Sequence, residues 1–306
     1  MTELGIVIVN WNTCDFLRRC LASVYASQRS SFEVVVVDNA SADGSADMVR
    51  TEFPQATLIA NEENAGYPRA NNQGLQALGY GAEGPTPPDY ALLLNPDTVL
   101  PPEALAEMVA FMEAHPEAGA AGPRLYLEDG TLDLACRRTF PTPDVAIPRM
   151  LGLARAFPNS RRFARYNLTF LDEYETAEVD SVVGAFMLVR GAAIARVGLL
   201  DEQFFMYGED LDWARRLKAD GWKVFYYPKV EVLHVKRAAS RQSERAQIEF
   251  YRAMLLFYRK YDRAHTPWYS HLLIMFGLLV KGGWQLLPEL LNENNKPSQD
   301  GIAARK

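Results

Sequence analysis

The run Ala91–Leu94, which ends at Asn95-Pro96-Asp97, constrains the fold more than any other part of the sequence. Four consecutive apolar residues are typical of a strand buried on both faces, as in the middle of a mostly parallel sheet. Pro96 has no N–H to donate and disfavours helical geometry at Asn95, so the strand is predicted to stop there. Asn95 and Asp97 would then lie at the carboxyl end of a central strand, where open α/β sheets bind their ligands.

An acid at this position, with a short polar side chain two residues before it, suits a hard divalent cation that carries a diphosphate. The alternative is that the segment is only a turn, in which Asp97 or Thr98 caps a helix that begins near Pro101-Pro102. The segment by itself leaves both interpretations open.

Apolar runs and helix-like segments alternate over the first hundred residues. Strands are expected at Gly5–Val9, Phe32–Val37, Thr57–Ala60 and Ala91–Leu94, and a helix is expected after each of the first three. This order predicts a Rossmann-like α/β half. No Gly-x-Gly-x-x-Gly fingerprint follows the first strand, which argues against a dehydrogenase.

Polar side chains follow the first two strands in place of that fingerprint. Asn10 and Asn12 follow the first strand, and Asp38 follows the second. A carboxylate at a strand end can accept the imide N–H of uracil or thymine. The alternative is that Asp38 forms an Asx turn and accepts hydrogen bonds from its own neighbouring backbone.

The second half of the chain is less regular. We expect helices at 101–115, 191–197 and from about 209 to 221, and strands at 119–122, 179–189, 224–227 and 230–235. Gly184-Ala185 interrupts the strand at 179–189. Residues 144–178 carry five arginines and are long for a loop, so we expect a lid or an acceptor-side excursion, or else a solvated helical face.

Three acidic residues, Glu209, Asp210 and Asp212, open the expected helix near 209. Acids in a first turn are favourable for the helix dipole, and this alone could explain them. Four large apolar residues, Phe204–Tyr207, precede them, however, and would place the carboxylates against a pocket wall. Carboxylates in such a setting can have raised pKa values and act as bases. His234 lies in the last expected strand and could be a metal ligand, a proton carrier or a structural residue.

Composition narrows the class of protein. The chain has 306 residues, is 48% hydrophobic and carries a net charge of −6. No basic face is evident, so general nucleic-acid binding is not expected. Three cysteines show no pairing pattern and no signal peptide opens the sequence, so we expect a reducing, cytoplasmic location.

The C-terminal part, residues 241–291, is expected to form helices outside the main domain. Its apolar run Leu272–Val280 is far shorter than the roughly 20 residues of a spanning helix. The aromatic and basic flanks of this run suit a helix lying peripherally on the inner face of the plasma membrane; they are Trp268, Tyr269, Lys281 and Trp284. The alternatives are packing on the domain and a homodimer interface. Residues 292–306 are polar and expected to be disordered.

Seven motifs occur together in one order: VIVNWN, VVVDNASADGS, NAGYPRANN, LLLNPDT, VVGAFMLVR, FFMYGEDLDWARRLKADGWKVFYYP and LHVK. Together they closely resemble the inverting family 2 glycosyltransferases of the GT-A fold, from Gly5 to about Lys236. Within that family they most resemble bacterial rhamnosyltransferases of cell-envelope polysaccharide synthesis.

The resemblance implies an α/β fold of GT-A type, with a Rossmann-like mixed, mostly parallel sheet flanked by helices and a C-terminal helical extension. Residues 1–240 would form the GT-A domain. Residues 1–100 would be its nucleotide-binding half, and residues 101–240 its acceptor and catalytic half.

The resemblance also implies residue roles. The residues implied in nucleotide binding are Asn10, Asn12, Asp38, Asn64, Gly66, Arg69 and Asn95. Asp97 and His234 would bind Mg²⁺ or Mn²⁺, and Asp210 would be the general base beside Glu209. The residues implied on the acceptor side are Arg137, Tyr207, Asp212 and Trp213. The family often has Asp-x-Asp where this chain has Asn95-x-Asp97, so we expect metal dependence with loose affinity.

The expected reaction is transfer of L-rhamnose from dTDP-rhamnose to a lipid-linked or saccharide acceptor, with inversion in one direct displacement. The first alternative is a UDP-sugar donor carrying galactofuranose or an N-acetylhexosamine. A nucleotidyltransferase is disfavoured because no Gly-rich basic loop follows the first strand. The last alternative is a catalytically silent nucleotide-sugar-binding scaffold.

Overall fold

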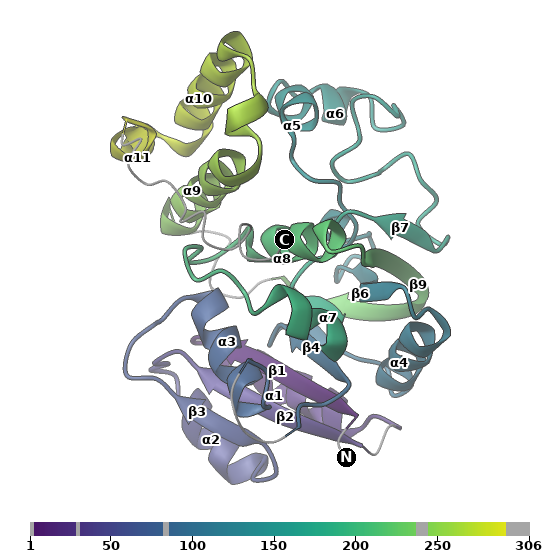
Figure 1. The fold of residues 1–306 in the computed structure, drawn as a ribbon. Helices are drawn as coiled ribbons and strands as arrows, with labels where there is room; N and C mark the ends of the chain where they lie inside the picture. Colours follow the sequence, from purple (N-terminus) through teal and green to yellow (C-terminus); the bar gives the residue numbers. More distant parts are fainter. Residues whose placement is uncertain (1–2, 29–30, 82–85, 237–243, 292–306) are drawn as a thin grey trace.

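The computed structural model describes residues 3–28, 31–81, 86–236 and 244–291. Within this part of the chain a nine-stranded sheet has the order β3-β2-β1-β4-β8-β6-β9-β5, and β7 pairs with β9 outside that path (Figure 1). The strands are β1 Leu4–Asn10, β2 Phe32–Asp38, β3 Thr57–Ala60, β4 Tyr90–Leu94, β5 Thr98–Val99, β6 Ala118–Tyr126, β7 Ala177–Val179, β8 Phe186–Arg190 and β9 Lys223–His234.

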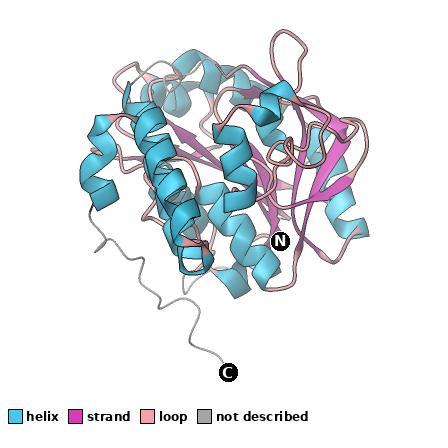
Figure 2. Ribbon diagram, turned by 90° about the horizontal axis from the view of Figure 1, so that it is seen from above, coloured by secondary structure: helices cyan, strands magenta, loops and turns pink. Residues whose placement is uncertain are grey.

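Helices cover both faces of this sheet (Figure 2). The α-helices are α1 Cys14–Tyr25, α2 Ser45–Glu52, α3 Tyr67–Ala77, α4 Ala104–Ala114, α5 Pro143–Met150, α6 Leu153–Ala156, α7 Gly191–Val197, α8 Glu209–Ala219, α9 Glu244–Tyr261, α10 Trp268–Gly282 and α11 Leu287–Leu291. Three short 3₁₀ helices are η1 Leu134–Cys136, η2 Arg263–His265 and η3 Trp284–Leu286.

The first four strands form the predicted Rossmann-like half. β1 pairs in parallel with both β2 and β4, and β2 pairs in parallel with β3. The chain runs outward from β1 to β3 and then returns across β1 to β4. Because such crossovers are right-handed, α1 and α2 cover one face of the sheet and α3 covers the other. Gly74 in α3 accordingly lies against Val7 of β1, where a Cβ would collide with the valine side chain.

The whole sheet is mixed and mostly parallel, as predicted. β8 is antiparallel to β4 and β6, while β9 runs parallel to β6. Only β5, β7 and β8 run against the direction of the other strands within the described sheet. The carboxyl ends of β1, β2, β4 and β9 therefore meet at one edge, and this edge gathers most of the predicted site residues.

Two strand predictions need correction. The segments 224–227 and 230–235 form one strand, β9, because β6 pairs with it on both sides of an irregularity opposite Pro123 and Arg124. Pro228 lies in that irregularity, where its missing N–H does not break a ladder bond. The predicted strand 179–189 is instead two strands, β7 and β8, and the segment between them turns toward α3 and α8.

The C-terminal helices form a separate small core. Leu255 and Tyr258 of α9 pack with Ile274 and Leu278 of α10, and Ile147 of α5 packs against this cluster. In the described residues, no helix combines the length and the apolar character that crossing a bilayer requires. The predicted disorder of 292–306 lies outside the described residues.

Candidate active site

The loops after β1 and β2 are tied together by the residues predicted to line the nucleotide pocket. Asn10 is fully buried, and its Nδ2 donates to Asp38 Oδ1 at 2.8 Å and to Ser41 Oγ at 3.1 Å. The Ser41 N–H donates to Asp38 Oδ2 at 2.9 Å. Asp38 therefore does form the turn that was its alternative role. Each of its carboxylate oxygens accepts one of these hydrogen bonds and has a further lone pair for a base.

Asn12, which is exposed, also connects the loops after β1 and β2 by hydrogen bonds. Its Oδ1 accepts from the Ala42 N–H at 2.8 Å, and its own N–H donates to Ser41 Oγ at 2.8 Å. Asn12 also has a positive φ of 53°, an uncommon backbone conformation that asparagine tolerates. The polar loop after β1 is thus fixed before any ligand binds.

Gly66 brings the loop before α3 against the loop before α8. Its φ is 85°, and a Cβ at this position would lie 2.8 Å from the Phe205 backbone oxygen, so glycine is needed. The Tyr67 N–H donates to that oxygen at 2.8 Å. Asn64 Oδ1 accepts from the Gly66 N–H at 3.0 Å, whereas Arg69 is exposed in the first turn of α3.

Tyr67, which the sequence did not single out, connects the strand-end residues to the acidic helix. Its hydroxyl lies 3.0 Å from both Asn95 Oδ1 and the Gly184 carbonyl oxygen. Burial, and then the negative charge of Glu209, raise the pKa of this phenol. Tyr67 therefore stays a hydrogen-bond donor and orients the Asn95 amide.

Asp97 and His234, the two predicted metal ligands, lie together at the sheet edge. The pairing of β5 with β9 places Thr98 opposite His234, and His234 Nε2 lies 3.4 Å from Asp97 Oδ1. His234 Nδ1 lies 2.8 Å from Asp133 Oδ2, and Lys236 Nζ lies 2.6 Å from Asp133 Oδ1. Burial lowers the pKa of His234, but its hydrogen bonds to Asp133 and Asp97 prevail and raise it to about 9.

This arrangement fits a divalent cation. A metal-binding histidine usually donates its other ring N–H to a carboxylate, and Asp133 is placed to accept from Nδ1 of His234. Nε2 and the Asp97 carboxylate then face the same point. Among the described residues no group of three or more His, Cys, Asp or Glu side chains is arranged to hold a metal ion. Two protein ligands therefore suit a cation whose other ligands come from phosphate and water.

Glu209 and Asp210 begin α8, directly after two residues with left-handed backbone, Tyr207 (φ 67°) and Gly208 (φ 81°). Asp210 Oδ2 accepts from Arg138 Nη2 at 2.7 Å and from the Gly184 N–H at 3.0 Å. Its Oδ1 accepts from the Leu211 N–H at 2.7 Å. The Asp210 carboxylate is thus held in one orientation.

Glu209 differs from its neighbour in having an unmatched oxygen. Glu209 is 5% exposed, and its Oε2 is buried without a hydrogen-bond partner in the described part of the chain. Burial, followed by the charge of Asp210, raises the pKa of Glu209 to about 8. The pair therefore consists of an ion-paired aspartate and a glutamic acid that is protonated at neutral pH.

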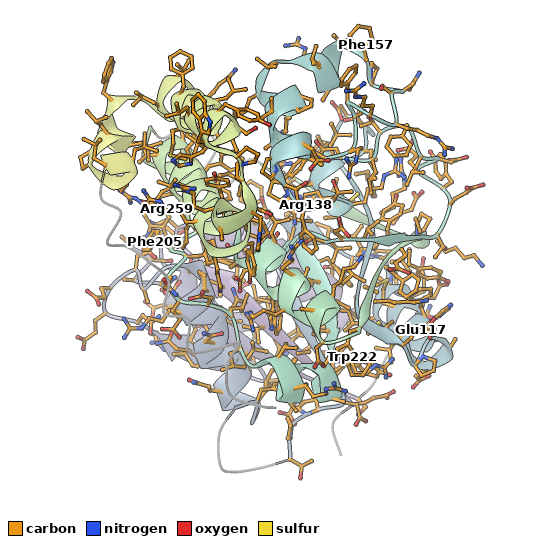
Figure 3. The ribbon with its side chains drawn as sticks, turned by 45° about the horizontal axis from the view of Figure 1, so that its top comes forward. Glu117, Arg138, Phe157, Phe205, Trp222 and Arg259 are labelled. Atoms are coloured by element: carbon orange, nitrogen blue, oxygen red, sulfur yellow. The ribbon has the colours of Figure 1, made fainter. Side chains whose placement is uncertain are left out.

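Arg138 is a further residue that the sequence did not single out. It is 7% exposed, lies near the middle of the molecule, and also donates through Nη2 to the Val182 carbonyl at 2.7 Å (Figure 3). The family resemblance implies an acceptor-side role for its neighbour Arg137 instead. Arg137 is buried against the Tyr226 ring and donates to the Leu171 and Asp172 carbonyls, so the structure does not place it at the site.

Two other predicted acceptor-side residues are also placed elsewhere. Asp212 is fully buried, and it accepts from Arg216 Nε at 2.9 Å and from Lys260 Nζ and the Tyr261 hydroxyl at 2.6 Å. Trp213 is fully buried too, and its Nε1 donates to the Gly198 carbonyl at 2.9 Å. Both residues face the protein interior. Tyr207 is partly exposed and packs edge-to-face on Phe250 of α9, so it remains at the wall of the site.

A cavity of about 440 Å³ lies beyond Arg138. Its lining residues are Thr139, Phe140, Thr142, Arg165, Asp180, Arg215, Lys218 and Ala219. Two of its three cations are paired with acids, Lys218 with Asp180 and Arg165 with Asp144. Arg215, Lys218 and Ala219 place the cavity beside the C-terminal half of α8, whereas Glu209 and Asp210 begin that helix.

The fold and these paired sites define a glycosyltransferase of the GT-A type: a Rossmann-like half, a polar strand edge with Asp97 and His234, and an acidic helix start facing it. The family described as Glycosyltransferase like family 2 matches residues 2–249, and the chain belongs to this family.

Relatives agree with this assignment. The chain is 31% identical over 241 residues to the N-acetylglucosaminyl-diphospho-decaprenol L-rhamnosyltransferase of Mycobacterium tuberculosis, covering 77% of each protein. It is 26% identical to the Escherichia coli rhamnosyltransferase WbbL, covering 75% of this chain and 82% of that protein.

Solved structures show the same fold. A Pyrobaculum calidifontis mannosyltransferase in complex with GDP-Man and Mn²⁺ has a TM-score of 0.57 and 19% identity, covering 90% of this chain and 72% of that chain. A structure of GalNAc-T7 with UDP, GalNAc and Mn²⁺ has a TM-score of 0.59 and 15% identity, covering 97% of this chain and 58% of that chain. Recognition of the fold and family from sequence motifs is therefore confirmed.

Proposed function

We propose that the protein transfers L-rhamnose from dTDP-rhamnose to a lipid-linked acceptor, with inversion at the anomeric carbon. The observation that carries the proposal is the chain of contacts from Asp210 through Gly184 and Tyr67 to Asn95, two residues from Asp97. It joins an acidic helix start to a strand edge suited to a diphosphate. The rhamnosyltransferase names of two relatives support the donor sugar.

The nucleotide would bind in the half formed by residues 1–100. Asp38 would accept the pyrimidine imide N–H, beside Asn10 and Asn12. Asn64, Gly66 and Arg69 would surround the sugar and phosphates, with Asn95 behind them. Support for this placement comes from the fixed orientation of the Asp38 carboxylate and from the rigid loop around Asn12.

Asp97 and His234 would hold Mg²⁺ or Mn²⁺, which supplies neutralisation of the charge on the departing diphosphate. Asp133 would keep the His234 ring in place through Nδ1, so that Nε2 is free to bind once its proton is lost. Because Asn95 replaces a second carboxylate, we expect a loosely bound cation.

Asp210 would take the proton from the acceptor hydroxyl. Its Oδ2 is occupied by Arg138 and Gly184, whereas Oδ1 accepts the Leu211 N–H and has a lone pair left for the incoming hydroxyl. Glu209, protonated near neutral pH, would donate a hydrogen bond beside it and limit the negative charge in the pocket. A positioned base of this kind contributes about 10²–10⁴-fold.

The lipid-linked acceptor would approach from residues 101–240, past Tyr207. The mycobacterial relative is named for a diphospho-decaprenol substrate, which supports an acceptor of this class.

Thermal denaturation with dTDP, UDP, GDP and ADP, each with and without Mg²⁺, tests the donor. A ligand at about 100 times its Kd adds about 2.7 kcal/mol of stability, a readily measured shift. Selective stabilisation by dTDP, stronger with Mg²⁺, is expected. Preference for UDP would move the donor to a UDP-sugar, and no shift with any nucleotide would favour a protein that lacks transferase activity.

A further inference from the structure

One face of α10 is apolar and exposed. Its residues are between 40% and 75% exposed: Trp268, Tyr269, Leu272, Leu273, Phe276 and Val280. At about 100° per residue they span an arc of about 140° on the helix. Trp284, just beyond the helix, is 78% exposed. These side chains form one continuous stripe.

The opposite face of the same helix is firmly packed, so the exposed stripe does not result from a loosely placed helix. Ile274 and Leu278 are buried against α9. Gly277 approaches α5 so closely that a Cβ there would collide with Met150. The orientation of α10 is fixed by these two neighbours.

The segment 143–162, which contains α5 and α6 and the residues directly after them, continues this surface. α5, α6 and α10 lie at the same end of the molecule, away from α2 and β3 (Figure 1). Leu151 and Phe157 are 62% and 53% exposed, and Phe157 points outward at this end (Figure 3). Three arginines of this segment are exposed as well: Arg155, Arg161 and Arg162. We call these residues and the α10 stripe the α5–α10 surface.

The sequence around α5, α6 and α10 is basic, whereas the chain as a whole is acidic. Residues 145–171 contain five arginines and no acid, and residues 263–288 contain one arginine, one lysine and no acid. The whole chain nevertheless has a net charge of −6. Arg165 is paired with Asp144, and Arg149 stacks on the Tyr166 ring. Arg155, Arg161 and Arg162 are exposed and place positive charge beside the exposed apolar side chains.

We propose that the α5–α10 surface docks on an anionic lipid bilayer. Tryptophan and tyrosine at the ends of an apolar stripe are placed for the level of lipid headgroups, and arginine and lysine attract anionic ones. A second copy of the chain fits less well, because a two-fold interface would bring the exposed cations of the two copies together, among them Arg155, Arg161 and Arg162. The proposal concerns lipid alone and does not depend on the donor or the acceptor.

Co-sedimentation of the full chain with vesicles tests this proposal without any substrate. Vesicles of phosphatidylcholine alone are compared with vesicles that also contain phosphatidylglycerol, at low and high salt. We expect binding to the anionic vesicles only, weakened by salt, because each basic residue near the surface contributes about fivefold. Equal sedimentation with both vesicle types, or none with either, would overturn the proposal.

Two variants locate the contact. Phe276→Glu and the double change R161E/R162E are each expected to lower vesicle binding by about tenfold or more. Arg50→Glu changes an exposed arginine on α2, at the far end of the molecule, and should leave binding unchanged. Because these side chains are exposed, we expect all variants to fold. Their melting temperatures verify this. If wild type is a dimer that Phe276→Glu dissociates, and vesicles are not bound, the surface is an interface between copies.

Discussion

Arg138 and Asp210 form a buried ion pair, 2.7 Å from Nη2 to Oδ2, between the loop after β6 and the first turn of α8. Their side chains are 9% and 7% exposed. The guanidinium also binds the Val182 carbonyl, so one side chain fixes both the candidate base and the chain segment before β8.

Replacing Arg138 by alanine should destabilise the protein strongly. It would leave the Asp210 carboxylate buried without its cation, and such losses cost about 3–5 kcal/mol. Urea denaturation measures this loss. Arg18→Ala is the matched control, because its pairs with Asp15 and Glu52 are exposed and should contribute little to stability. If the two variants lose similar amounts of unfolding free energy, Arg138 does not stabilise the protein through a buried ion pair.

Replacing Asp210 by asparagine should abolish sugar transfer and leave nucleotide affinity within about threefold. The change keeps the size of the side chain but removes the proton acceptor, so it acts on chemistry rather than on binding. Transfer assays and calorimetry with the nucleoside diphosphate measure the two quantities. A large loss of nucleotide affinity would mean that Asp210 is a ligand-binding or structural residue.

Replacing Glu209 by glutamine should flatten the pH dependence of stability. The folded-state pKa of about 8 lies above that of an exposed glutamate, about 4.3, so the folded protein holds a proton that the unfolded chain releases. This contribution is fully present below about pH 4.3 and is lost as pH rises through 8. The wild type should therefore lose stability from pH 5 to about pH 9 relative to Glu209→Gln, as measured by denaturation at each pH. Parallel curves would contradict the assignment.

Removal of divalent cations should stop transfer, and modest concentrations of Mg²⁺ or Mn²⁺ should restore it. Two protein ligands, Asp97 and His234, give a loose site that dialysis against chelator empties. Asp133→Asn should raise the Mn²⁺ concentration needed for half-maximal nucleotide stabilisation by about 10–100-fold, because it weakens the support of the His234 ring. Full activity in excess chelator would exclude the metal role.

The strand edge was predictable from the sequence, whereas the support around it was not. Apolar runs that end in polar residues placed Asn10, Asp38 and Asp97 at the carboxyl ends of parallel strands, and topology then brought them together. Asp133 meets His234 from a loop 101 residues away, and no local pattern marks such a contact.

The sequence alone also does not show whether Arg137 or Arg138 contacts Asp210. Successive side chains of an extended backbone point to opposite sides, so the two arginines face different surroundings although they are neighbours. Deciding which of them reaches Asp210 requires the pairing of Arg138 with Ser181, a contact that only the folded chain supplies. The surroundings of Asp212 were not predictable for a similar reason, since its partners Lys260 and Tyr261 lie on α9.

The Asp212→Asn variant distinguishes the role of Asp212 from that of Asp210, the other aspartate of α8. Asp212 binds three side chains in the interior, whereas Asp210 lies at the site. The asparagine variant would leave Lys260 and Arg216 without a full negative charge and should lose about 2–4 kcal/mol of stability. Its kcat, measured below the lowered melting temperature, should stay within about threefold of wild type, unlike that of Asp210→Asn. A stable Asp212→Asn protein with strongly reduced kcat would return Asp212 to the acceptor side, because a buried structural carboxylate cannot give that combination.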